Sequence, residues 1–150
     1  MENTAELQHR IVSKLEIALR NDAIEAKTQI GLINNAGRSN VQVGLSNKAT
    51  EINGAQIGLL ENDSVKVNGF QIAGVMNDSF EVSGSQIAGF ANGAEKIYGF
   101  QGALLYNRCG EDSCGVQFGL INHRKGGDWY SRFIPLIAVR TGMKDNHNKN

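Results

Sequence analysis

The most reactive side chains of the sequence gather in one short segment. Cys109 and Cys114 flank a four-residue loop, and His123 follows a few residues later. The spacing allows a Cys109–Cys114 disulfide in an oxidising compartment, and the alternatives are two thiols or metal and redox chemistry. A structural zinc site needs four ligands, and His123 is the only further candidate nearby. The segment therefore offers a candidate disulfide and predicts no metal site.

Acid–base and nucleophilic catalysis find little support in the sequence. Glu111 and Asp112 are adjacent, so their carboxylates point apart and do not form an acid–base pair. The histidines (His9, His123 and His147) are dispersed, and the sequence holds no Gly-x-Ser-x-Gly elbow and no phosphate-binding loop. We predict no catalytic, cofactor-binding or metal-binding residue and no enzyme. The alternative is a small enzyme or ligand-binding protein with its site near His123 and the Cys109–Cys114 loop.

A second group of candidate residues is aromatic and lies near the end of the chain. Trp129, Tyr130, Arg132 and Phe133 have the composition of a binding hot spot. They are candidate partner-binding residues. The alternative is that a closing strand packs these aromatic side chains against the last repeat.

The elements that must position these residues are repeats. Seven glutamines recur at intervals of 13 to 16 residues, and an asparagine follows each of them five or six residues later. The glutamines are Gln29, Gln42, Gln56, Gln71, Gln86, Gln101 and Gln117, and the asparagines are Asn34, Asn47, Asn62, Asn77, Asn92, Asn107 and Asn122. A glycine stands two residues before most of the glutamines. A fixed period of this length identifies a repeat protein.

Each repeat has the two-residue alternation of a strand with one buried face, as in Val65–Asn68. Two mainly-β architectures fit: a β-solenoid of about seven coils of ~15 residues, or an antiparallel β-meander or barrel. We favour the solenoid because stacked coils would place identical amides and opposite charges ~4.8 Å apart. The charges in question alternate in sign at 15-residue spacing: Glu51, Lys66, Glu81, Lys96 and Glu111. We expect one inward column of Ile30, Val43, Ile57, Ile72 and Ile87, and a second of Ile52, Val67, Val82 and Ile97.

The two ends of the chain depart from the repeat, within a single domain of residues 1–150. Leu7, Ile11, Leu15 and Leu19 recur every four residues, which predicts an amphipathic helix over 4–26 that caps the first coil of the repeats at 28–123. Residues 127–150 are expected to form a closing strand and a polar tail. The alternatives for the helical stripe are self-association or binding to a membrane surface.

Composition narrows the partners. Fifteen basic and fifteen acidic residues give a net charge of zero, so the chain lacks the basic field that would attract nucleic acid. We therefore expect no nucleic-acid partner. No apolar run approaches the ~20 residues of a membrane helix, so no integral membrane segment is expected. The N-terminus lacks the pattern of a signal peptide, which leaves the location open between the cytoplasm and export by another route. We expect an unknown protein partner, or self-association through the helix or the solenoid ends.

The units Gln29–Asn34, Gln56–Asn62 and Gly115–Asn122 resemble the tandem Gly-x-Gln-Ile-Gly-Leu-x-Asn motifs of bacterial surface-repeat lipoproteins. The resemblance covers residues ~28–123 and implies a repeat architecture without a defined activity. Together with the missing catalytic cluster, it favours a non-catalytic structural or binding protein that presents a rigid β surface to a protein or to itself.

Overall fold

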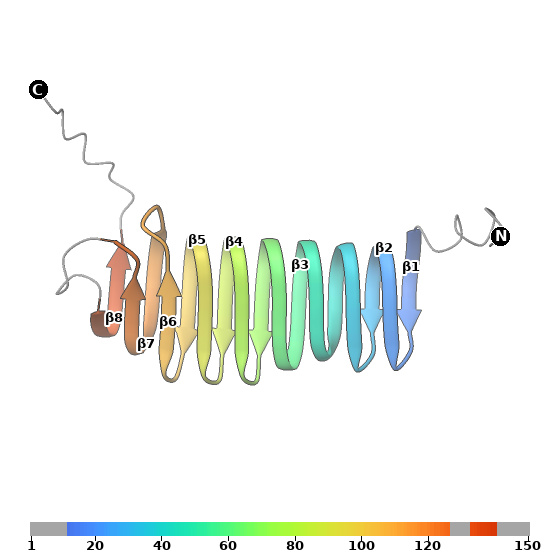
Figure 1. The fold of residues 1–150 in the computed structure, drawn as a ribbon, viewed down its shortest axis with the longest axis horizontal. Helices are drawn as coiled ribbons and strands as arrows, with labels where there is room; N and C mark the ends of the chain where they lie inside the picture. The colour runs from blue at the N-terminus through green and yellow to red at the C-terminus, as the bar shows by residue number, and fades with distance from the viewer. Residues whose placement is uncertain (1–11, 127–132, 141–150) are drawn as a thin grey trace, which may run out of the picture.

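The structure is a computed structural model that describes residues 12–126 and 133–140. The strands are β1 (Val12–Ile17), β2 (Arg20–Ile30), β3 (Ile33–Ala73), β4 (Met76–Ala88), β5 (Ala91–Ala103), β6 (Tyr106–Cys109), β7 (Cys114–Arg124) and β8 (Phe133–Arg140). From β1 to β7 every pairing is parallel, and β8 pairs antiparallel with β7. Figure 1 shows the coils stacked along the long axis, with β1 at one end and β8 at the other. The predicted β-solenoid of about seven turns is confirmed.

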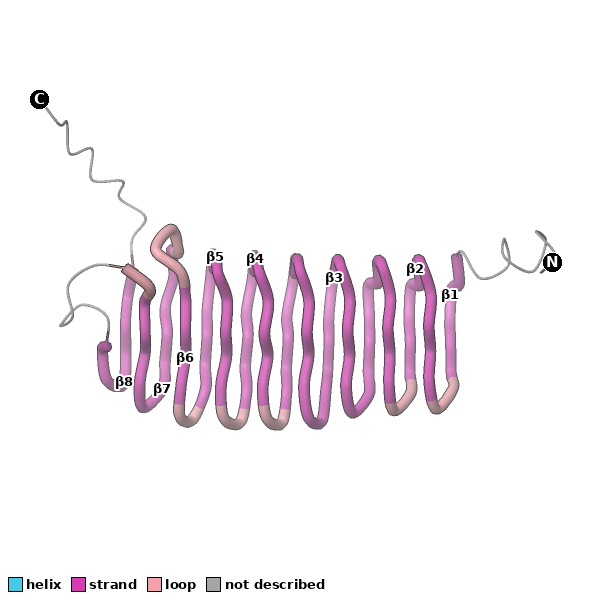
Figure 2. The backbone as a smooth tube through the Cα atoms, in the orientation of Figure 1, coloured by secondary structure: helices cyan, strands magenta, loops and turns pink. Residues whose placement is uncertain are grey.

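The register places each repeat directly on the one before it. Gln71 pairs with Gln86, and Gln86 pairs with Gln101. Figure 2 shows the backbone winding continuously through strand segments with short turns between them. Long strand elements such as β3 therefore pass through several coils. The meander alternative is wrong, because neighbouring repeats run parallel.

Glycines form one corner of the coil. Gly84 has φ of +138°, a region that favours glycine. A Cβ at Gly84 would lie 2.0 Å from the carbonyl oxygen of Gly69 in the preceding coil. The same corner recurs at Gly54, Gly69, Gly99 and Gly115. From Gln56 onward, the glycine two residues before the glutamine is therefore required twice, for the backbone angle and for the close approach of neighbouring coils.

The predicted N-terminal helix is wrong over residues 12–26, and its residues 4–11 lie outside the described part of the chain. Strands β1 and β2 occupy this region, and the described residues contain no helix. Leu15 and Leu19 fit an every-second-residue pattern as well as the helical stripe, and Ile17 between them fits only the strand pattern. Glu16 pairs with Gln29, so a further coil with glutamate in the glutamine position replaces the helix.

Two ladders of buried amides run through the interior in opposite directions. Each glutamine Nε2 donates toward the N-terminal end, as from Gln86 to Gln71 Oε1 at 2.8 Å. Each asparagine Nδ2 donates toward the C-terminal end, as from Asn77 to Asn92 Oδ1 at 2.9 Å. The second amide hydrogen of Asn77 reaches the carbonyl of Ile87 at 2.9 Å. Because the buried amides are bonded in both directions, their burial is tolerated.

The inward columns differ from the predicted ones in one respect. Ile52, Val67, Val82 and Ile97 are buried as predicted and form the apolar core with alanines and Cys109. The column of Ile30, Val43, Ile57, Ile72 and Ile87 faces outward, and this prediction is wrong. The glutamine next to each of these residues is buried instead. A strand that buries the glutamine must expose its neighbour, because adjacent side chains point to opposite faces.

Three residues of the predicted charge column, Lys66, Glu81 and Lys96, are paired in the strand register. Lys66 pairs with Glu81, and Glu81 pairs with Lys96. The Lys66 Nζ lies 3.8 Å from Glu81 Oε1. The shorter coils extend the alternation, since Arg38 Nε lies 3.3 Å from Glu51 Oε2.

The C-terminal end of the stack is closed by β8. Ala138 is buried opposite Gln117, the last glutamine of the ladder. Asn122 Nδ2 donates to the carbonyl oxygen of Ile134 at 3.1 Å. The predicted closing strand thus lies at Phe133–Arg140, while Trp129, Tyr130 and Arg132 lie outside the described residues.

Candidate functional site

An exposed apolar surface follows from the inward position of the glutamines. The residues one before, one after and three after each glutamine must all face outward, because the strand alternates. None of these positions carries a charged side chain from Leu15 to Leu120. We call this surface the apolar face. It is built from one outward column of Ile17, Ile30, Val43, Ile57, Ile72, Ile87 and Phe118, and from another of Leu19, Leu32, Leu45, Leu59, Leu104 and Leu120.

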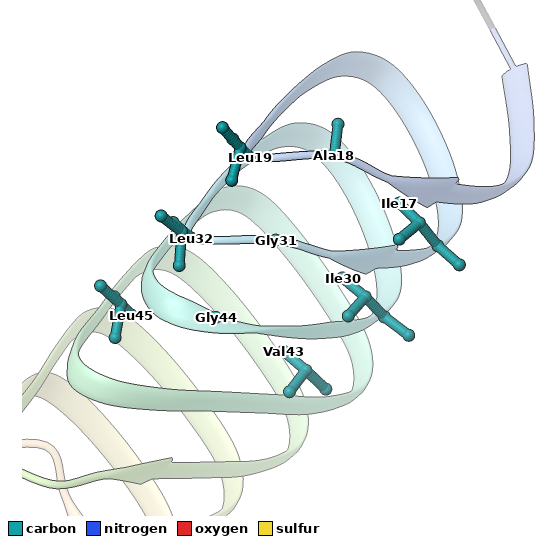
Figure 3. A pocket seen from close by; sticks show the side chains of 9 residues that line it. All are labelled: Ile17, Ala18, Leu19, Ile30, Gly31, Leu32, Val43, Gly44 and Leu45. Carbon is teal, nitrogen blue, oxygen red and sulfur yellow. The ribbon is translucent and has the colours of Figure 1, made fainter.

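The side chains of the apolar face are well exposed. Ile72 is 43% exposed and Leu104 is 74% exposed. Figure 3 shows the two columns in the first coils, with Ile17, Ile30 and Val43 aligned in one row and Leu19, Leu32 and Leu45 in the other. Gly31 and Gly44 lie between the rows. The rows border a shallow groove of about 580 Å3 with an almost entirely apolar lining.

The closing strand β8 continues the apolar face. Ile137 pairs with Phe118, and Val139 pairs with Val116. Both residues of β8 are more than half exposed, at 56% for Ile137 and 67% for Val139. The apolar face therefore runs from β1 to β8 without a charged residue at its centre.

Sequence reasoning missed this face because it placed the isoleucines inside. A signal was available in the residue two after each glutamine, which is always glycine or alanine. Where this residue is alanine, at Ala73, Ala88 and Ala103, it is at most 5% exposed. That position must be small because it faces the tight interior, which fixes the isoleucine before it as outward.

The two predicted cysteines lie at the last coils. Cys109 is fully buried in the core and Cys114 is half-buried, and both are thiols in this structure. Cys109 pairs with Arg124, whereas Cys114 pairs with Tyr98. The disulfide remains a prediction.

His123 lies beside Tyr106 on the outside of the last coil. The Tyr106 hydroxyl and His123 Nδ1 are 2.7 Å apart. Arg124 takes the next position, at the end of an inward column, and its Nη2 donates to the carbonyl of Glu111 at 2.6 Å. The Arg124 Nε is buried without a hydrogen-bond partner among residues 12–126 and 133–140. This arrangement closes the open end of the core over Cys109.

The loop carboxylates form a separate depression of about 300 Å3. Glu111 and Asp112 line it together with Glu95, Lys96 and Lys125, and His123 does not belong to the lining. Lys125 Nζ bonds to Glu95 Oε1. This hydrogen bond lowers the pKa of Glu95 below its usual value, and nearby Arg108 adds to the effect. Within the described ranges no group of three or more His, Cys, Asp or Glu side chains is placed to hold a metal ion.

Of the candidate hot-spot residues, only Phe133 falls within a described element, as the first residue of β8. Within the part of the chain that the structure describes, no helix is both long and apolar enough to cross a membrane. Comparison with protein-family models, curated proteins and solved structures found no match. The resemblance to surface-repeat lipoproteins therefore remains a prediction based on the motif.

Proposed function

We propose that the protein is a non-catalytic repeat scaffold that binds protein through its apolar face. The observation that carries the proposal is the set of outward apolar columns, interrupted only by glycines, with residues such as Ile57, Ile72 and Leu59 left 42%, 43% and 65% exposed. Monomeric soluble proteins rarely expose a contiguous apolar patch larger than ~300–600 Å2. A larger patch is typical of an interaction surface.

Rigidity supports the same function. Every coil is joined to the next by backbone pairing and by the two buried amide ladders, so the outward side chains are held on a fixed lattice. A preorganised surface loses little conformational entropy on binding. The scaffold therefore presents apolar anchors at regular intervals without a loop that must first become ordered.

The proposal is tested with one substituted variant and one matched control. Ile57→Glu combined with Ile72→Glu places charges on the apolar face, whereas Phe80→Glu changes an apolar residue outside it that is 53% exposed. At protein concentrations too low for self-association, we expect the wild type and Phe80→Glu to bind an apolar fluorescent dye in the folded state and to retain the same captured proteins. The double variant should lose at least half of the dye signal and the captured proteins. Equal dye binding and capture by all three would contradict the proposal.

A further inference from the structure

We propose that the apolar face is a homodimer interface, in which two copies of this chain pack face to face. The inference rests on the proposed function and deepens it by naming the partner as a second copy. The solenoid ends, which the sequence had suggested as contacts, are not part of this interface.

The outward columns of two copies have the same spacing. The outward columns repeat at the spacing of the coils, ~4.8 Å, and a second copy has the same spacing. The ridge of Ile57, Ile72 and Ile87 on one copy can therefore fit beside a ridge of the other copy along its whole length. Two β faces that pack in this way interdigitate their side chains and exclude water. A helical partner lacks this spacing and would meet the lattice at fewer points.

The apolar face has the area that a stable dimer needs. From Glu16 to Ala138 the stack rises through eight pairing steps, or about 38 Å, and the face is about 17 Å wide across five residues of strand. The flat area is then about 650 Å2 on each copy and about 1,300 Å2 for a pair, above the ~1,000 Å2 that a specific interface needs. The accessible area of a ridged surface is larger than its flat area. The face alone is thus sufficient for a stable dimer.

The segments outside the described residues have too few large apolar side chains to cover the face. The segments 1–11, 127–132 and 141–150 contain only six large apolar or aromatic side chains: Met1, Leu7, Ile11, Trp129, Tyr130 and Met143. They are too few to cover two columns that extend over eight coil levels. Within this sequence, only another copy of the face offers enough apolar surface.

The charge pattern favours a second copy over a membrane. Interfacial lipid binding by proteins commonly combines an apolar face with a rim of Lys and Arg. Beside the apolar face lie Glu61 and Ser46, which are joined by a hydrogen bond, and the adjoining outward column mixes Asp63 and Asp78 with Lys48. The chain has no net charge. Lys14, Lys27 and Arg20 border only the N-terminal end of the face, and Arg20 is paired with Asp22. A rim of mixed charge gives an anionic surface little net attraction, whereas a copy of the same face meets no repulsion at the centre.

The dimer is tested by measuring mass and length together. Light scattering and sedimentation should give a dimer for the wild type, and small-angle scattering should give a maximum dimension close to that of one solenoid. In a two-fold dimer each substitution acts twice, so Ile57→Glu with Ile72→Glu should raise the dissociation constant at least about hundredfold. Phe80→Glu should leave it unchanged. Circular dichroism and the melting temperature would verify that all variants are folded.

Each other outcome overturns the inference in a distinguishable way. A dimer of about twice the length of one solenoid would place the contact at the ends. A monomer that binds phosphatidylcholine or phosphatidylserine vesicles through the face would replace the second copy with lipid. A monomer that captures other proteins through the face would overturn the dimer and leave the proposed function standing. A monomer with no face-dependent dye binding or capture would overturn both.

Discussion

Two neighbouring residues of the same strand, Gln71 and Ile72, occupy positions opposite to what their polarity suggests. Gln71 is fully buried, whereas Ile72 is 43% exposed. The Gln71 amide accepts from Gln86 Nε2 and Ser79 Oγ at 2.8 Å each. It donates to Gln56 Oε1 at 2.7 Å. The interior of the solenoid is thus held by polar ladders, and its exterior carries much of the large apolar surface.

Whether a side chain is buried in this solenoid depends on its size and on whether its polar groups find hydrogen-bond partners, as well as on its hydrophobicity. A glutamine that bonds to its equivalents above and below avoids the penalty of an unpaired buried polar group. In the opposite phase of the strand, isoleucine would be inside and glutamine outside. The buried isoleucine would then make no hydrogen bonds between coils, and the exposed glutamine would not form a buried amide ladder. The apolar side chains left outside are then available for binding.

The largest expected effect comes from breaking a ladder at its centre. Gln71→Leu leaves donors and acceptors of the neighbouring coils unpaired, so the free energy of unfolding should fall by about 2–5 kcal/mol. Ile72→Gln on the outward side should change it by less than about 1 kcal/mol. Urea denaturation, extrapolated to low protein concentration so that self-association does not contribute, measures both. Equal losses for the two variants would contradict the distinction between the inner and outer positions.

The same two positions explain how far the sequence could predict the structure. The period, the parallel stacking and the amide and charge ladders are readable because each repeats at equivalent residues. The phase of the strand is not, since hydrophobicity alone favours Ile72 inside and Gln71 outside. The glycine or alanine two residues after each glutamine indicates the correct phase, because a small residue suits an inward position, as the buried Ala73 and Ala88 show.

The N-terminal coil was missed for a related reason. Leu15 and Leu19 fit both a helical stripe and a strand, and Glu16 hides the repeat by replacing glutamine. The Gln29 Nε2 donates to Glu16 Oε2 at 2.7 Å. The Glu16 carboxylate thus takes the acceptor role that a glutamine side-chain oxygen has in the other coils. The apolar face was missed together with the phase. A search that allowed glutamate in the repeat would have found this coil.

The corner glycines have less room for a side chain than glycines on the outside of the coil. Gly84→Ala would place a Cβ 2.0 Å from the Gly69 carbonyl oxygen at a φ of +138°. Strain and crowding should lower the free energy of unfolding by about 2–4 kcal/mol. Gly93 has no such positive φ, and its Cβ would meet the side-chain oxygen of Asp78, which can move. Gly93→Ala should therefore have a smaller effect, and the opposite order in thermal unfolding would contradict this view of the corner.

The charge column should contribute less than either interior feature. Lys66→Glu replaces an ion pair with a like-charge contact between Glu81 and the new carboxylate, and exposed pairs are worth ~0–1 kcal/mol. The melting temperature should fall by a few degrees in low salt and recover in part at high salt. Lys14→Glu, at an exposed position in β1, serves as the control. A melting temperature of Lys66→Glu that does not depend on salt would argue against an electrostatic role for the column.

The smallest expected effect concerns Glu95, which bonds to Lys125 outside the core. Its pKa is lowered in the folded protein, so its contribution to stability is present above the pKa of the unfolded chain, near 4.5, and is lost as the pH falls through the folded value. Glu95→Gln should therefore lower the free energy of unfolding at pH 7 by at most about 1 kcal/mol. The difference from wild type should shrink as the pH is lowered from 5 toward 3. Lys125→Met on the Glu95→Gln background should add no further pH dependence in this range, since the pair is already broken. Urea denaturation at several pH values tests this, and a difference that stays constant down to pH 3 would show that the Glu95 carboxylate does not stabilise the last coils through Lys125.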